Sequence, residues 1–244
     1  MTSDSGVGGA AGSVTAVGIG PGNPAYVTGN VRDELARADV VVGFETVVGY
    51  VDQFVGGDIL TCGYDDEEAT LERFGERVAA GEHGVAALMG DPNVSGHQFL
   101  DSVREAVPGT VTVRPGISSI QVAASRAVVP FEETTFVTLH RRGPLDDELD
   151  RIARAAGDRH LLVLPRPYDW MPEDIAAFLF DTAESTDRTN RSELRATVYE
   201  HLTHDEERST ETTLGTLAAG SGGNGPEDSA FSDLSVVLVR GDQV

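Results

Sequence analysis

The chain has 244 residues, 40% hydrophobic and 24% charged, which is typical of a globular protein and excludes a fibrous or wholly disordered one. Its 18 basic residues, all arginine, face 40 acidic residues, and the resulting net charge of −22 repels nucleic acid and anionic membranes, so we expect neither as a partner. Cys62 is the only cysteine, which excludes an intrachain disulfide and a multi-cysteine metal centre, and no apolar run approaches the ~20 residues of a membrane span.

The first half of the chain alternates short apolar strands with amphipathic helices. Segment 1–13 is rich in Gly, Ser and Ala and lacks the basic start and apolar block of a secretion signal, so we interpret it as the flexible tail of a cytoplasmic protein. Apolar runs predict strands at residues 14–18, 39–43, 85–89 and 111–113. Helices are predicted at residues 31–38 and around Leu71, Phe74 and Val78. This alternation favours an α/β domain with a largely parallel sheet.

A second set of strands and helices follows the Pro and Gly residues near position 115. Strands are predicted at 134–139, 161–164, 196–200 and 234–239, with a flexible loop at 219–229. Helices are predicted around Leu145, Leu149 and Ile152 and around Ile175, Phe178 and Leu179, the latter opened by Pro172. We therefore predict a two-lobed α/β fold, 14–114 and 115–244, each lobe a mixed, largely parallel sheet with flanking helices, and a small-molecule cleft between them.

Three glycine-containing loops follow predicted strands, at residues 18–24, 90–96 and 114–121. The first invites a dinucleotide-binding interpretation, but Asn23 stands where that fingerprint requires its third glycine. In the other two, Asp91 and the Ser118-Ser119 pair could simply cap helices, or the serines could bind an anion at a helix start. Because open α/β sheets bind ligands at the carboxyl ends of their strands, three such loops favour one shared pocket.

These motifs resemble the tetrapyrrole (corrin/porphyrin) methylases, which are two-lobed S-adenosylmethionine enzymes. The resemblance spans about residues 14 to 240 and rests on GIGPGNP at 18–24, ADVVVG at 38–43, GDP at 90–92 and PGISS at 115–119. Within the family, PGISSIQVAA at 115–124 and VYEHLT at 198–203 are most similar to the cobalt-precorrin-7 C5-methyltransferase (CbiE type) branch. The chain departs from the family at residues 93–95, where glycine and aromatic residues are common, and from the branch at His201, where Asn is more frequent.

The resemblance implies transfer of a methyl group from S-adenosylmethionine to a ring carbon, C5, of a cobalt-precorrin in cobalamin biosynthesis. It also implies a homodimer and, since no decarboxylating domain follows before Val244, a separate decarboxylating C15-methyltransferase. By motif, the expected cofactor-binding residues are Pro21, Gly90, Asp91, Ser95, Ser118, Ser119, Leu164 and Ala196. His140 is the candidate base for any proton lost from the ring.

Arginines are the expected ligands of the substrate's carboxylates, because guanidinium pairs act at contact range whereas distant charge is screened. The candidates are Arg114, Arg126, Arg141, Arg142 and Arg166, each of which could instead form a surface salt bridge. His201, His204 and Asp205 are too few for a convincing metal site, and we expect none.

Other functions are compatible with these motifs. A tetrapyrrole methylase of different regiospecificity and a non-catalytic tetrapyrrole- or nucleoside-binding protein both fit, while Asn23 argues against a dinucleotide oxidoreductase. The acidity and lack of lysine suggest a halophilic protein, because molar salt shortens the range of self-repulsion to about 3 Å.

Overall fold

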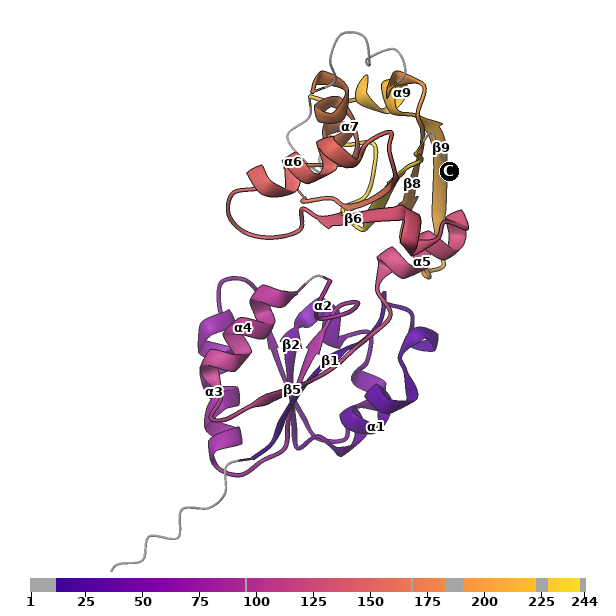
Figure 1. The fold of residues 1–244 in the computed structure, drawn as a ribbon. Coiled ribbons are helices and arrows are strands. Elements are labelled where there is room, and N and C mark those ends of the chain that lie inside the picture. Colours follow the sequence, from indigo (N-terminus) through magenta and orange to yellow (C-terminus); the bar gives the residue numbers. More distant parts are fainter. Residues whose placement is uncertain (1–11, 95, 168, 183–190, 223–227, 242–244) are drawn as a thin grey trace, which may run out of the picture. The chain divides into compact units, whose positions relative to one another are not determined.

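The computed structural model describes residues 12–94, 96–167, 169–182, 191–222 and 228–241 (Figure 1). The chain divides into two compact units, one ending at Ile117 and the other beginning at Ser118. Residues 1–11 of the expected tail, and Ser95, lie outside the described residues. In the described part of the chain, no helix is long and apolar enough to cross a membrane.

The first unit is built on a five-stranded sheet whose strands all run parallel, in the order β3-β2-β4-β1-β5. The strands are β1 (Val14–Gly18), β2 (Val40–Phe44), β3 (Asp58–Cys62), β4 (Gly84–Leu88) and β5 (Val111–Arg114). All five residues of β1 and of β4 are buried, as expected for central strands of a sheet that is covered on both faces.

Helices cover both faces of this sheet. The helices are α1 (Gly29–Arg37), α2 (Glu45–Val48), α3 (Glu67–Ala79) and α4 (His97–Ala106), with short 3₁₀ turns η1 (Pro24–Tyr26) and η2 (Asp52–Phe54). One core cluster joins Phe74 of α3 and Leu100 of α4 to alternate strand residues such as Ala16. The second core cluster joins Leu35 of α1 to the strand residues that point to the opposite face, such as Val17. The predicted α/β class is therefore confirmed, although β3 and α4 were not predicted.

The second unit contains a mixed sheet in the order β6-β7-β10-β8-β9. Its strands are β6 (Thr134–Thr138), β7 (His160–Leu164), β8 (Arg195–Glu200), β9 (Arg208–Thr213) and β10 (Ser235–Val239). Of the neighbouring strand pairs in this sheet, β6–β7 is parallel and the other three are antiparallel, so the sheet is mixed, as predicted, but not largely parallel. The reason is that the short connection from β8 to β9 makes a hairpin and β10 returns antiparallel between β7 and β8.

Within the described residues, four helices pack on this second sheet. They are α5 (Ser119–Ala127), α6 (Asp146–Ala155), α7 (Pro172–Asp181) and α9 (Leu214–Ala218), preceded at β6 by the 3₁₀ turn η3 (Phe131–Glu133). Residues of α6, α7 and α9 share one core cluster with Leu161 and Val163 of β7. Since strand residues alternate between faces, Leu162 points to the opposite face, and α5 contacts β7 and β10. The helix α7 begins at Pro172, as predicted.

Candidate cofactor-binding site

Three loops meet at the carboxyl edge of the first sheet. In the strand order, β1 lies between β4 and β5, and all three run parallel, so they end at the same edge. The loops that follow them contain the three glycine motifs of the sequence. This edge is the position at which open parallel sheets bind ligands.

Glycines hold the three loops in backbone contact. Gly20 and Gly90 exchange backbone hydrogen bonds, with N···O distances of 3.3 and 2.8 Å. A Cβ placed on Gly18 would lie 2.5 Å from the carbonyl oxygen of Gly90, and one on Gly116 only 2.2 Å from that oxygen. Any side chain at position 18 or 116 would therefore force the loops apart.

Asp91 ties the loop after β4 to the loop after β5. Its Oδ2 accepts a hydrogen bond from the backbone N–H of Gly116 at 3.1 Å, and its Oδ1 accepts two from Asn93, at 2.7 and 3.1 Å. Asp91 does not cap the next helix, because the N-cap of α4 is Gly96 in the left-handed conformation. A carboxylate accepts about four hydrogen bonds, so one acceptor position of Asp91 remains for a ligand.

Ser118 and Ser119 form the start of α5. The Ser118 hydroxyl accepts a hydrogen bond from the backbone N–H of Gln121 at 3.3 Å, and the Gln121 side chain accepts one from the Ser118 N–H at 2.8 Å. This capping box uses the buried Ser118 as an N-cap, whereas Ser119 is partly exposed in the first turn, where the helix dipole favours an anion. Of the remaining candidates in the first unit, Pro21 and Gly90 are buried.

The two candidates in the second sheet lie in different surroundings. Leu164 is partly exposed at the end of β7, and its carbonyl accepts a hydrogen bond from the Leu139 N–H at 2.8 Å. Ala196 is 1% exposed in the core of the unit, paired with Val239 on one side and Thr212 on the other. Its side chain therefore offers no surface to a ligand in this conformation.

The candidate residues Arg141 and Arg166 are brought together at the carboxyl ends of β6 and β7. Arg166 donates from Nη1 to the carbonyls of Arg141 (3.3 Å) and Gly143 (3.0 Å), and from Nε and Nη2 to both oxygens of Asp169 (2.7 and 2.5 Å). Arg141 pairs with Glu148 at 2.8 Å. Arg166 thus holds the loop at 141–143 in place. Sequence analysis did not identify Asp169 as the partner of Arg166, although the two residues are three positions apart.

His140 follows the end of β6 and directly precedes Arg141. It is exposed, and its backbone N–H donates to the Thr138 hydroxyl at 3.2 Å. Desolvation by surrounding protein lowers the pKa of His140, while the Asp233 carboxylate acts in the opposite direction. The net shift of the pKa is downward and favours the neutral imidazole.

The remaining arginines differ in their pairing. Arg126 makes a bidentate ion pair with Glu207, at 2.6 and 3.1 Å. It therefore forms the surface salt bridge that was considered above as the alternative to substrate binding. That hydrogen bonding holds the pKa of Glu207 below its usual value. Arg142 is exposed. Arg114 ends β5, and its buried Nε has no hydrogen-bond partner among the described residues.

His201 and His204 lie in the turn between β8 and β9, with ring centroids 6.5 Å apart. Within the described ranges, no group of three His, Cys, Asp or Glu side chains is arranged to hold a metal ion. Two turn residues, His201 (φ 49°) and Thr203 (φ 75°), adopt the left-handed conformation, which is uncommon outside glycine.

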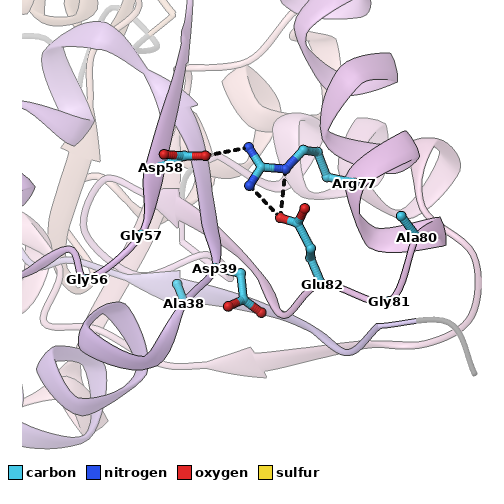
Figure 2. A pocket seen from close by; sticks show the side chains of 9 residues that line it. All are labelled: Ala38, Asp39, Gly56, Gly57, Asp58, Arg77, Ala80, Gly81 and Glu82. Carbon is cyan, nitrogen blue, oxygen red and sulfur yellow. Dashed lines mark hydrogen bonds and ion pairs between the residues drawn. The ribbon is translucent and has the colours of Figure 1, made fainter.

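An open hollow of about 500 Å³ lies at the opposite, amino edge of the first sheet (Figure 2). It is lined by residues that precede β2 and β3 and by the end of α3. Its single arginine, Arg77, is already paired with Asp58 at 2.8 Å and Glu82 at 2.6 Å. Because it lies at the amino edge, the hollow is remote from the three glycine loops. The positive charge of Arg77 is neutralised by carboxylates of the same chain.

The same amino edge contains a buried carboxylate that is fully paired. Glu34 accepts hydrogen bonds from the Thr15 hydroxyl (2.9 Å) and Arg37 (3.1 Å), and lies 3.1 Å from His83 Nε2. Burial raises the pKa of Glu34, but these partners outweigh it and the net shift is downward. The other ring nitrogen of His83 contacts the Ser13 hydroxyl at 2.7 Å. This network fixes α1 to the start of β1.

Comparison with known proteins places this geometry in a family. The family profile described as Tetrapyrrole (Corrin/Porphyrin) Methylases matches residues 13–218, which confirms the resemblance at the level of the family. A search of curated proteins found no match. Among solved structures, the methyltransferase CobJ has a TM-score of 0.73 at 23% identity and covers 95% of each chain.

Two further solved structures share the fold. The cobalamin biosynthesis precorrin-6Y methylase (CbiE) of Archaeoglobus fulgidus has a TM-score of 0.63 at 21% identity, covering 94% of this chain and 98% of its own. The uroporphyrin-III C-methyltransferase of Thermus thermophilus, in complex with S-adenosylhomocysteine, has a TM-score of 0.69 at 22% identity and covers 94% and 97%. At these identities the likeness concerns the fold alone.

Proposed function

Because this chain belongs to the tetrapyrrole (corrin/porphyrin) methylase family, which uses S-adenosylmethionine, we propose that it methylates a ring carbon of a cobalt-precorrin, at C5, in cobalamin biosynthesis. The observation that carries this proposal is the convergence of three glycine loops at the carboxyl edge of the first sheet. The C5 position rests on the motifs at residues 115–124 and 198–203.

Groups on the loops after β1 and β4, and at the start of α5, suit the cofactor. S-adenosylmethionine, when bound, supplies an electrophilic methyl group on a sulfonium, together with an ammonium, a carboxylate and ribose hydroxyls. Asp91 has an acceptor position for a hydroxyl or ammonium group, and the start of α5 at Ser119 suits a carboxylate. The backbone at Pro21 and Gly90 would form the wall of the pocket. Ser95 remains a motif-based expectation.

The protein's contribution to the reaction is orientation. Positive charge at sulfur is lost as a methyl group moves. A close ion pair between a carboxylate and the sulfonium would therefore stabilise the ground state more than the transition state. Good alignment of reacting atoms can lower the barrier by about 7–11 kcal/mol. Loops locked by glycine contacts and by Asp91 are suited to rigid positioning, and no nucleophilic side chain is required.

Arginines would bind the substrate. A corrinoid precursor carries acetate and propionate carboxylates, and a chain with a charge of −22 needs local cations to hold them. We assign this role to Arg141 and Arg142, on the loop held by Arg166, and to Arg114, whose buried Nε has no described partner. Arg126 stays in the proposal, and like Arg141, which is paired with Glu148, it would exchange its carboxylate partner, Glu207, for one on the substrate. His140 would take up any proton lost from the ring.

One partner follows from the family resemblance. We propose that the chain acts as a homodimer.

Labelled-methyl transfer tests the proposal. The chain would be incubated with methyl-¹³C S-adenosylmethionine and cobalt-precorrin candidates, and the product carbon identified by NMR. We expect one new methyl signal at C5. A methyl group on another ring carbon would overturn the C5 assignment, and tight binding of the precursor and S-adenosylhomocysteine without transfer would identify a non-catalytic binding protein.

A further inference from the structure

Arg32, on α1, is bonded to the first of the three glycine loops. Its Nη2 donates a hydrogen bond to the carbonyl oxygen of Pro24 at 2.7 Å, and Pro24 is the last residue of the loop at 18–24. Hydrogen bonds from a charged donor are shorter and stronger than those between neutral groups. The end of the loop is therefore fastened to a helix by a charge-assisted bond.

The guanidinium of Arg32 also lies against an aromatic ring. Its Cζ is 4.8 Å from the centroid of the Phe54 ring, within the range of a cation–π interaction. Phe54 ends η2 and packs against the core cluster that contains Leu35 of α1. Because the core holds this ring, the ring in turn fixes the position from which Arg32 reaches Pro24.

The contacts of Arg32 differ from those of its neighbour on the same helix. Arg37 pairs with the carboxylate of Glu34 at 3.1 Å. Although the chain has 40 acidic residues, Arg32 forms no ion pair within the described ranges, and its buried Nε has no hydrogen-bond partner there. A buried N–H without an acceptor costs free energy. Ion pairing therefore does not account for the position of this side chain, which engages the loop carbonyl and the ring.

The bond to Pro24 fixes the second end of a loop whose first end is already held. Gly20, near the start of the loop, exchanges backbone hydrogen bonds with Gly90 in the loop after β4. Pro21, whose backbone we assign to the wall of the cofactor pocket, lies between these two fixed ends. Arg32 and Pro24 are not members of the apolar core cluster on this face of the sheet. Loss of their bond should therefore loosen the segment around Pro21 while the core beneath it stays packed.

We propose that Arg32 is a positioning residue for the methyl donor. Through the carbonyl of Pro24 it holds the backbone at Pro21 in the conformation that binds S-adenosylmethionine, and Phe54 holds Arg32 in place. The inference rests on the proposed binding of the donor by the three glycine loops. It extends that site to two residues, on α1 and η2, that lie outside the glycine motifs.

Calorimetry with S-adenosylhomocysteine tests the role of Arg32. Arg32→Met keeps most of the side-chain length but removes the donor and the charge, and it should raise the Kd about tenfold, as expected for the loss of one charge-assisted hydrogen bond. Arg32→Lys retains a charged donor and should recover part of this loss. Arg37→Met is the matched control, because it removes an ion pair from the same helix. It should lower the free energy of unfolding in urea and leave the Kd unchanged.

The outcomes separate the positioning role from a structural one and from the proposed function. A folded Arg32→Met with the Kd of the unmodified chain would overturn the inference, and so would an equal rise in Kd for Arg37→Met, since destabilisation of α1 would then explain both. Should Arg32→Met fail to fold, an unchanged Kd for Arg32→Lys would overturn the inference. If the unmodified chain does not bind S-adenosylhomocysteine, the proposed function fails and the inference fails with it.

A double-mutant cycle tests the link between Phe54 and Arg32. Phe54→Leu keeps an apolar side chain but removes the ring face, and it should raise the Kd about threefold. Because Phe54 acts through Arg32, the double variant should bind no more weakly than Arg32→Met alone. An unchanged Kd for a folded Phe54→Leu, or effects that multiply in the double variant, would show that the ring does not hold Arg32 and would contradict the inference.

Discussion

Val128 is a strained residue at the end of α5. Its backbone is left-handed (φ 54°, ψ 51°), and its side chain is 86% exposed. A β-branched residue in this conformation is a genuine outlier and costs roughly 1–2 kcal/mol relative to glycine, which adopts it freely. Little burial compensates this strain.

We predict that Val128→Gly stabilises the second unit by about 1 kcal/mol, because relief of strain exceeds the added entropy of the unfolded chain. Urea denaturation would measure it. Val128→Ala, which removes the side chain but keeps the strain, should change the free energy of unfolding much less. A Val128→Gly variant less stable than the unmodified protein would refute the prediction.

Glu200 is the most buried charged group among the described residues of the second unit, at 1% exposure. It accepts hydrogen bonds from Arg208 at 2.7 and 2.6 Å and from the Ser232 N–H at 2.8 Å. Burial raises the pKa of Glu200, but these donors outweigh it, and the net shift is below the ordinary value of 4.5. The charged form therefore stabilises the fold.

A carboxyl group with a lowered pKa contributes stability above its unfolded pKa, and that contribution is lost as the pH falls through the folded value. Glu200→Gln should thus cost about 2 kcal/mol at pH 7, and the difference from the unmodified protein should shrink below about pH 4.5. Urea denaturation at pH 7 and pH 3.5 would measure it, with the exposed Glu211→Gln as control. A difference that is the same at both pH values would contradict this account.

Residue contacts such as these were beyond sequence analysis. Arg126 meets Glu207 across 81 positions, and Asp91 reaches Gly116 across 25, distances at which one sequence carries no pairing signal. The residue types were predictable, because glycine and aspartate after a strand indicate a tight turn. Which donor each carboxylate would choose depends on the packed fold.

At the level of elements, continuous apolar runs predicted the central strands and their loops. The run at residues 85–89 became β4, and the run at 14–18 became β1. Strand direction in the second unit was not predictable, because a buried antiparallel strand such as β8 has the same apolar run as a parallel one. The edge strand β3 was missed because three of its five residues, Asp58, Ile59 and Thr61, are exposed.

The loop at residues 141–143 depends on Arg166. We predict that Arg166→Lys raises the Michaelis constant for the tetrapyrrole about tenfold, equivalent to about 1.4 kcal/mol, and leaves the affinity for S-adenosylhomocysteine unchanged, since a lysine cannot reach both loop carbonyls and Asp169. Steady-state kinetics and calorimetry would measure the two quantities. Arg154→Lys, on the exposed face of α6, is the matched control and should change neither. Unchanged kinetics for Arg166→Lys would show that the loop does not bind substrate.

At the level of the whole molecule, the acidic surplus is the dominant feature. Even if every arginine paired with one carboxylate, 22 acidic side chains would remain without such a partner. Their mutual repulsion acts over about 10 Å at 0.1 M salt and about 3 Å at 1 M. We predict that the melting temperature rises by several degrees between dilute buffer and molar KCl. Equal melting temperatures in dilute buffer and in molar KCl would contradict the proposed adaptation to salt.

The central claim is that the three glycine loops bind the methyl donor. Hydrogen exchange of the backbone, followed by mass spectrometry with and without saturating S-adenosylhomocysteine, tests it most directly. We predict slower exchange in peptides containing residues 18–23, 89–94 and 115–119, and unchanged exchange around the hollow formed by Asp39, Asp58 and Arg77. Protection at that hollow without protection of the loops would contradict the account.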